Sequence, residues 1–138
     1  MNRTEFLKIL KQIMESEEGC TTKTTAKKGE GFVLYNRHGI KWGQIDTKEN
    51  YVRLVFDLKP GSLSEKRFID NTGLSITPPR KLLTGYRYTV SNNGKGHDQL
   101  ILFLKDAFLT EQTETLNDIL IYVKEFVAQS GFKSQPSR

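Results

Sequence analysis

The sequence predicts an α+β domain in which an antiparallel meander sheet of about four strands is packed on one face by N- and C-terminal helices. Two observations support this prediction. Apolar and polar residues alternate through residues 32–58, with short turn sequences between the strands. Apolar residues recur at helical spacing near both ends of the chain. Because a meander alone is unstable in water, the terminal helices are expected to cover its apolar face.

A first helix is expected over residues 3–18. Asn2 and Glu5 have the spacing of a capping box, and Gly19 follows as a helix stop. The apolar stripe of this helix consists of Phe6, Ile9, Leu10 and Ile13. Residues 21–30 lack an apolar anchor and are expected to form either a mobile basic loop or a ragged edge strand.

Three consecutive strands are predicted from the segments FVLYNR, IKWGQID and YVRLVFDL. In the third strand, one side carries Val52, Leu54, Phe56 and Leu58, and the other side carries Tyr51, Arg53, Val55 and Asp57. A short helix capped by Ser62 and Glu65 and a long connection over residues 74–85 are expected next. Alternation in residues 86–90 predicts a fourth strand.

Residues 98–108 leave two alternatives open. The five apolar residues 100–104 fit a strand, but a helix is favoured because Asp98 suits an N-cap and apolar spacing continues to Phe108. A last helix is expected from residue 110 or 113 to just before Gly131, and it buries Leu116, Ile119, Leu120, Val123 and Val127. Residues 1–130 thus form a single domain, and residues 131–138 are expected to form a disordered tail.

The composition favours a cytoplasmic protein without a membrane segment. The 138 residues are 36% hydrophobic and 27% charged, and no apolar run is long enough to cross a bilayer. The N-terminus lacks a signal-peptide pattern, and the single cysteine, Cys20, excludes an internal disulfide. His38 and His97 have no second ligand at metal spacing, so neither a metal site nor another cofactor is expected.

Positive charge is concentrated in the strand region. The net charge is +5, and residues 31–105 hold twelve Lys and Arg against six Asp and Glu. Such a concentration favours nucleic acid or another polyanion as a partner. The alternative is an ordinary solvated surface.

Several short segments of the chain follow one another in the order typical of one domain family. They are Gly31-Phe32, Lys41-Trp42, Tyr51-Val52-Arg53-Leu54, Thr84-Gly85-Tyr86-Arg87 and residues 98–108. In these segments the chain resembles an uncharacterised small bacterial domain often labelled "predicted transport protein", which also occurs attached to restriction-type proteins. The resemblance covers about residues 6–108. It implies no established chemistry, and the transport label finds no support in a sequence without membrane segments.

We expect a non-catalytic binding module associated with nucleic acid through a basic and aromatic face of the sheet. Aromatic rings stack on bases, and guanidinium groups pair with phosphates. Basic loops that contain Lys23, Lys27 and Lys28 would add phosphate contacts. The alternative is ordinary cross-strand packing with solvated Lys and Arg. The candidate nucleic-acid-binding residues are Arg37, Lys41, Tyr51, Arg53, Arg80, Lys81 and Arg87.

Two further functions remain open. Asp46 and the Asp57-Leu58-Lys59 sequence follow the order of acidic and lysine residues in restriction-endonuclease-like nucleases, so Asp46, Asp57 and Lys59 are candidate catalytic residues of a Mg²⁺-dependent enzyme. Alternatively, the broad apolar stripe of the last helix fits a protein-interaction domain that forms a homodimer through this helix.

Overall fold

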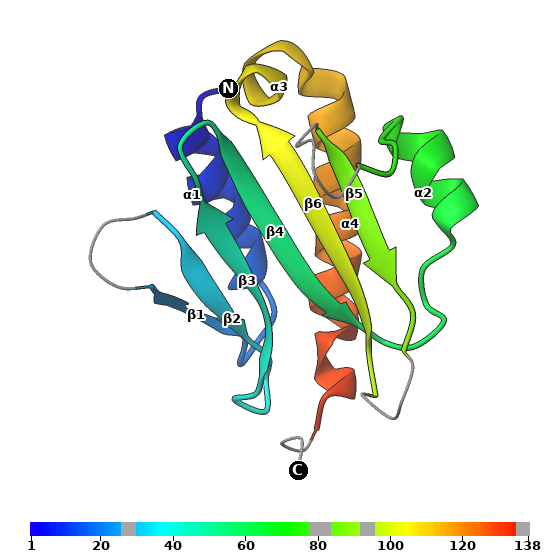
Figure 1. Ribbon diagram of the computed structural model, residues 1–138. Coiled ribbons are helices and arrows are strands. Elements are labelled where there is room, and N and C mark those ends of the chain that lie inside the picture. Colours follow the sequence, from blue (N-terminus) through cyan, green and yellow to red (C-terminus); the bar gives the residue numbers. More distant parts are fainter. Residues whose placement is uncertain (26–29, 78–83, 92–95, 135–138) are drawn as a thin grey trace.

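The computed structural model describes residues 1–25, 30–77, 84–91 and 96–134. One antiparallel sheet, in the strand order β1-β2-β3-β4-β6-β5, forms its centre (Figure 1). The strands are β1 (Thr21–Thr24), β2 (Phe32–Tyr35), β3 (Lys41–Thr47), β4 (Tyr51–Leu58), β5 (Gly85–Thr89) and β6 (Asp98–Lys105). The helices are α1 (Arg3–Met14), α2 (Glu65–Thr72), α3 (Asp106–Glu111), α4 (Thr113–Gln129) and the 3₁₀ helix η1 (Ser130–Phe132).

The two long helices lie on the same side of the sheet. Figure 1 shows α1 and α4 behind the strands and α2 beside β5. Side chains that face these helices form one core and are almost fully buried. On β4 this set is Val52, Leu54, Phe56 and Leu58, which alternates with partly exposed residues as predicted. The predicted α+β class is therefore confirmed.

The cap predicted for the first helix and the apolar spacing predicted for the last helix are both confirmed. The Asn2 side chain accepts a hydrogen bond from the Glu5 backbone N at 2.9 Å, which satisfies one free amide of the first turn. Helix α1 ends at Met14, one turn before the predicted end at residue 18. Helix α4 buries all five residues expected of it, Leu116, Ile119, Leu120, Val123 and Val127.

The predicted count of about four strands is wrong, because the sheet has six. The first additional strand is β1, which pairs with β2 along one edge of the sheet. Residues 21–24 thus form the edge strand that was one of two predictions for this segment, and residues 26–29 lie outside the described part of the chain. The second additional strand is β6.

The helix favoured for residues 98–108 is also wrong, since residues 98–105 form the strand β6. This strand lies between β4 and β5. Its side chains that point away from the helices include Ile101 and Phe103, which are apolar and at least partly buried, so its sequence reads as a continuous apolar run. The helical spacing that extended to Phe108 arises because α3 begins immediately after the strand, at Asp106. Asp98 consequently starts a strand and caps no helix.

A register shift in the β2–β3 pair turns Trp42 into the core. Leu34 pairs with Gly43 and Tyr35 pairs with Lys41, so Trp42 is the extra residue of a β-bulge. The Trp42 ring is 1% exposed and stacks on Phe56 with ring centroids 5.8 Å apart. The bulge therefore places a large aromatic ring under the helices while Lys41 keeps its exposed position.

Helix α2 is capped by Ser64 and not by Ser62, because the Ser64 hydroxyl accepts a hydrogen bond from the Arg67 backbone N at 3.3 Å. At the C-terminus, the described part of the predicted tail is ordered: Ser130–Phe132 is a 3₁₀ turn, and Lys133 contacts the sheet. Residues 135–138 lie outside the described residues. Within the described segments, no helix has both the length and the apolar character that crossing a bilayer requires.

Candidate functional site

The face of the sheet that points away from α1 and α4 carries no helix in the described parts of the chain (Figure 1). We call it the open face. Apart from the bulge at Trp42, its side chains alternate with those of the core along the strands. Its charged and aromatic side chains are those of Lys23 on β1, Tyr35 on β2, Lys41 and Asp46 on β3, Tyr51, Arg53 and Asp57 on β4, Arg87 on β5, and Phe103 and Lys105 on β6.

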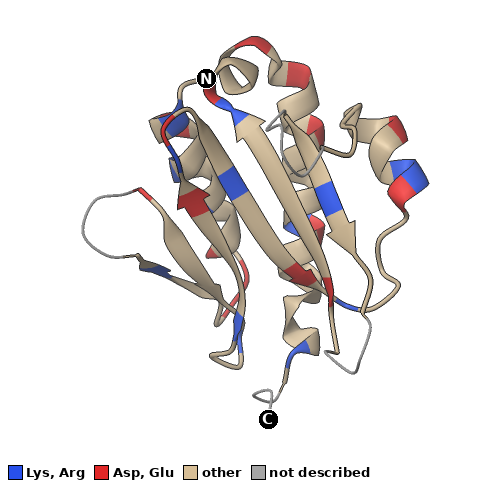
Figure 2. Cartoon of the chain, viewed as in Figure 1, with Lys and Arg blue, Asp and Glu red and all other residues tan. Residues whose placement is uncertain are grey.

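The open face is positive overall, but its charges are mixed. Five Lys and Arg on the strands stand against two Asp, and Lys133 from the C-terminal segment adds a sixth cation. Figure 2 shows the acidic and basic positions interspersed on neighbouring strands. An excess of positive charge over one surface raises the local concentration of anionic ligands.

A row of hydrogen-bonded side chains joins β3 to β4. Arg53 donates from Nε and Nη2 to Asp46 Oδ2, at 3.0 and 2.6 Å. Gln44 Nε2 donates to the same oxygen at 3.0 Å, and Gln44 Oε1 accepts from Lys41 Nζ at 2.8 Å. Because Asp46 lies directly opposite Arg53 in the strand register, their side chains meet on the same face. Asp46 therefore fixes Arg53 and offsets its charge.

Aromatic side chains lie next to this row. The rings of Tyr51 and Phe103 have centroids 6.3 Å apart, and Arg87 Cζ lies 4.9 Å from the Phe103 centroid in a cation–π contact. Phe103 is only 5% exposed. Tyr51 and Arg87 thus shield Phe103 from water, and Tyr51 is the ring of this group that remains partly exposed.

A pocket of about 400 Å³ opens on the same face, where β3, β4 and β6 lie side by side. Lys133 Nζ donates to Asp57 Oδ2 at 2.7 Å and to the Lys41 carbonyl at 3.1 Å. On the other side of the carboxylate, His97 Nε2 lies 3.4 Å from Asp57 Oδ1. The remaining lining residues are Ile40, Gly43, Gln44, Val55 and Gln99.

Asn36 holds the C-terminal segment in this position. Its side chain is fully buried, and its Nδ2 donates to the carbonyls of Ser130 and Lys133, at 2.9 and 2.7 Å. Its Oδ1 accepts from the backbone N atoms of His38 and Ile40 in the β2–β3 turn. One buried amide therefore ties the turn to the segment that delivers Lys133 to the pocket.

Asp98 ties together two loops next to the pocket. The Asp98 carboxylate accepts hydrogen bonds from the Tyr88 hydroxyl and from the backbone N atoms of Gly61 and Ser91. Burial acts to raise the pKa of Asp98, but these hydrogen bonds outweigh it and place the pKa below its usual value. Burial and the bond to Asp98 raise the pKa of Tyr88, and burial with a bond to Glu65 raises the pKa of Tyr86 to about 12. The hydrogen bonds of Asp98 therefore stabilise the fold by joining these loops to the sheet.

The predicted nucleic-acid-binding residues separate into three groups. Arg37 lies in the turn between β2 and β3, and its side chain approaches Gly131 beside a pocket that Glu17 and Glu18 also line. Two of the predicted residues and two lysines of the basic loop lie outside the described residues: Arg80, Lys81, Lys27 and Lys28. The remaining four share the open face, and they are Lys41, Tyr51, Arg53 and Arg87.

The three residues of the nuclease alternative do not form a cluster. Asp46 is opposite Arg53, which is four residues from Asp57 along β4, a separation of about 13 Å in an extended strand. Mg²⁺ holds its oxygen ligands at about 2 Å, so one ion does not bridge these carboxylates. Lys59 follows β4 at an exposed position. In the part of the chain that the structure describes, no group of three or more His, Cys, Asp or Glu is placed to hold a metal ion.

Sequence reasoning missed three residues of the open face. Phe103 and Lys105 were hidden because residues 98–108 were assigned to a helix. A polar residue at each end of an apolar run is the signal that would have identified the strand. Lys133 carries no local signal, since the contact with the buried Asn36, 97 positions away, brings it to the sheet.

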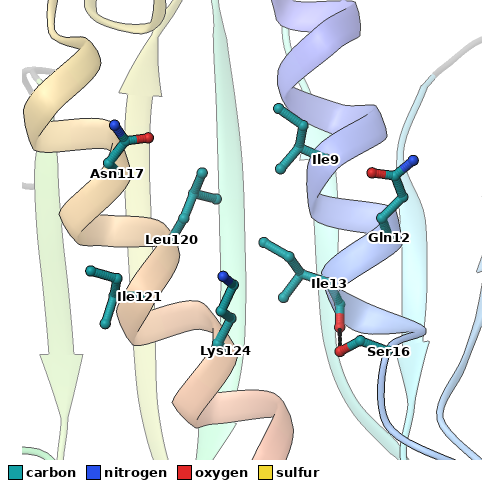
Figure 3. Close-up of a pocket in the computed structure, with 8 residues that line it drawn as sticks. All are labelled: Ile9, Gln12, Ile13, Ser16, Asn117, Leu120, Ile121 and Lys124. Carbon is teal, nitrogen blue, oxygen red and sulfur yellow. Dashed lines mark hydrogen bonds between the residues drawn. The ribbon is translucent and has the colours of Figure 1, made fainter.

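A second pocket, of about 490 Å³, lies on the helical side between α1 and α4 (Figure 3). Most of the apolar stripe of α4 is covered by the sheet, but Ile121 is 55% exposed beside this groove. A homodimer formed through α4 stays a prediction, and this groove is where its contact would lie. The lining residues are Ile9, Gln12, Ile13, Ser16, Asn117, Leu120, Ile121 and Lys124.

A functional assignment rests on the geometry of the open face, because comparison with protein families and curated proteins adds no function. The resemblance to the bacterial domain labelled "predicted transport protein" stays a prediction that rests on the sequence segments quoted above. No protein-family model matches the chain, and no curated protein matches it.

Proposed function

We propose that this chain is a non-catalytic module that binds single-stranded nucleic acid across its open face. One observation carries the proposal: five strands each place a cation on the face that both long helices leave uncovered, around partly exposed aromatic side chains. Proteins that bind single strands combine a positive surface along the backbone with rings on which bases stack.

Three lysines are suited to contact phosphates. Lys23, Lys41 and Lys105 form no ion pair among the described residues. They lie on β1, β3 and β6, which are separated by four strand spacings in total, or about 19 Å. Along the axis of a stacked nucleic-acid strand, successive phosphates are spaced by about 3.4 Å. A nucleic-acid strand that lies across the sheet would therefore present several phosphates to these lysines.

Tyr51 and Tyr35 are the rings that would stack on bases. Both are partly exposed on the open face, and the Tyr51 ring packs against the neighbouring ring of Phe103. Base–aromatic stacking contributes about 1–3 kcal/mol per base and tolerates any sequence. The proposed module is therefore expected to bind single strands better than duplexes and to show little base preference along most of the face.

Salt dependence provides the first test. With about three phosphate contacts, the logarithm of the binding constant should fall with the logarithm of salt concentration with a slope of about −2. Fluorescence anisotropy of a labelled single-stranded oligonucleotide, titrated at several salt concentrations, measures both affinity and slope. Absence of binding at low salt would refute the proposal.

Variants locate the contact on the molecule. Lys105→Ala should lower the affinity and reduce the slope by about 0.7, and Tyr51→Ala should weaken binding roughly tenfold. Lys124→Ala is the matched control, because Lys124 is an exposed lysine of α4 on the helical side. An equal loss of affinity in Lys124→Ala and Lys105→Ala would mean that binding depends on net charge and not on the open face.

A further inference from the structure

The pocket beside Asp57 offers more hydrogen-bond donors than its internal contacts use. Lys133 Nζ directs two of its three protons to Asp57 and to the Lys41 carbonyl. Lys41 Nζ donates to Gln44, and the side-chain amide of Gln99 has no hydrogen-bond partner among the described residues. Donors from three residues therefore line one cavity with capacity for a ligand that accepts hydrogen bonds.

The pocket is positive although it contains a carboxylate. Lys41 and Lys133 supply two positive charges against the single negative charge of Asp57. The side chains of Lys133 and Asp57 are each 15% exposed, so water screens their interaction only weakly. Without Lys133, the charges of Lys41 and Asp57 would cancel, and the ordered C-terminal segment thus makes this pocket positive.

Asp57 also makes the pocket selective among anions. An ionised carboxylate has about four acceptor positions, and Lys133 and His97 approach it at one oxygen each. A ligand that is anionic and also carries an O–H group would receive hydrogen bonds from Lys41, Lys133 and Gln99 and donate one to Asp57. Inorganic phosphate and a singly protonated phosphomonoester have this O–H group, whereas sulfate and phosphodiesters lack it.

We propose that this pocket binds a phosphomonoester or inorganic phosphate group, with Lys133 neutralising Asp57 and Asp57 accepting a hydrogen bond from the phosphate O–H. Its volume of about 400 Å³ lies within the range of small-molecule pockets. The phosphate has two sources, the terminal phosphate of a strand lying on the open face and free phosphate. The first source rests on the proposed nucleic-acid binding, whereas the second does not.

Calorimetric titration with inorganic phosphate and with sulfate, at about pH 6.5 and constant ionic strength, tests the pocket alone. Phosphate should bind about tenfold more tightly than sulfate, the effect of one hydrogen bond to a charged group. Asp57→Asn should remove this preference, and Lys133→Met should abolish phosphate binding. Equal affinity for the two anions, a preference that survives in Asp57→Asn, or no phosphate binding would overturn the proposal.

Oligonucleotides with 5′-phosphate, 3′-phosphate or hydroxyl ends identify the source. A gain in affinity from one terminal phosphate, lost in Asp57→Asn, assigns the pocket to a strand end. Inorganic phosphate binding without such a gain assigns it to free phosphate. Phosphate binding in a protein that binds no oligonucleotide refutes the nucleic-acid proposal and leaves the pocket standing.

Two controls accompany these measurements. Lys124→Ala removes a lysine from the helical side and should leave phosphate affinity unchanged, so an equal loss there would contradict the assigned site. Thermal melts verify that each variant folds. If Lys133→Met fails to fold, the phosphate-to-sulfate ratio in Asp57→Asn still decides the outcome.

Discussion

Asp46→Asn is expected to lower stability while it strengthens nucleic-acid binding. The Asp46 carboxylate accepts hydrogen bonds from Arg53 and Gln44. The side chains of Arg53 and Asp46 are 34% and 19% exposed, which places the pair between a surface ion pair and a buried one. The amide keeps one acceptor for Arg53 but loses the charge, so the free energy of unfolding should fall by about 1 kcal/mol.

The effect on binding has the opposite sign because Arg53 is released from its counter-ion. One additional phosphate contact should steepen the slope of the salt dependence by about 0.7. At low salt this contact should raise the affinity for a single-stranded oligonucleotide roughly five- to tenfold, which corresponds to about 1–1.4 kcal/mol and lies within the net range of an ordinary hydrogen bond.

Urea denaturation followed by far-UV circular dichroism gives the change in stability, and anisotropy at four or more salt concentrations gives the affinity and slope. Asp118→Asn is the matched control, because it removes the same charge from an exposed position of α4 and should leave the slope unchanged. An affinity that falls in parallel with stability in Asp46→Asn, or an unchanged slope, would refute the reasoning.

Two further predictions concern the core and the loop anchor. Phe56→Ala should lower the free energy of unfolding by about 4 kcal/mol, because Phe56 is fully buried between the rings of Trp42 and Phe126; a loss below about 1 kcal/mol in urea denaturation would contradict this packing. The pKa of Asp98 lies below its usual value, so its carboxylate stabilises the fold above the unfolded pKa of about 3.9, and this stability is lost as pH falls through the folded pKa. Asp98→Asn should therefore destabilise strongly at about pH 7 and least at about pH 2, and an equal loss at both pH values would contradict the sign of the shift.

Local sequence patterns were sufficient for the meander and the terminal helices. Alternation in residues 51–58 identified which side of β4 enters the core, and with it the open-face positions of Tyr51 and Arg53. The Asn2 cap and the apolar stripe of α4 were likewise visible, because each depends on neighbours within a few residues.

Features that depend on distant partners were not predictable. The apolar run of β6 favours a helix in the sequence, because Ile101 and Phe103 are apolar on the open face and remove the alternation that marks a strand. The position of β6 between β4 and β5 explains this run. The pocket was missed for a related reason. Asp57, His97 and Lys133 are far apart in sequence, and the pairing of β4 with β6 and the Asn36 contact bring them together.

The β-bulge at Trp42 supplies a built-in optical reporter. Trp42 is the sole tryptophan of the chain, and its indole is enclosed between the strands and the helices, where it stacks on Phe56. Its emission should shift to longer wavelength when the two layers separate, because the ring then meets water. Ligands on the opposite surface of the sheet should leave that spectrum unchanged, so one intrinsic signal distinguishes loss of structure from occupancy.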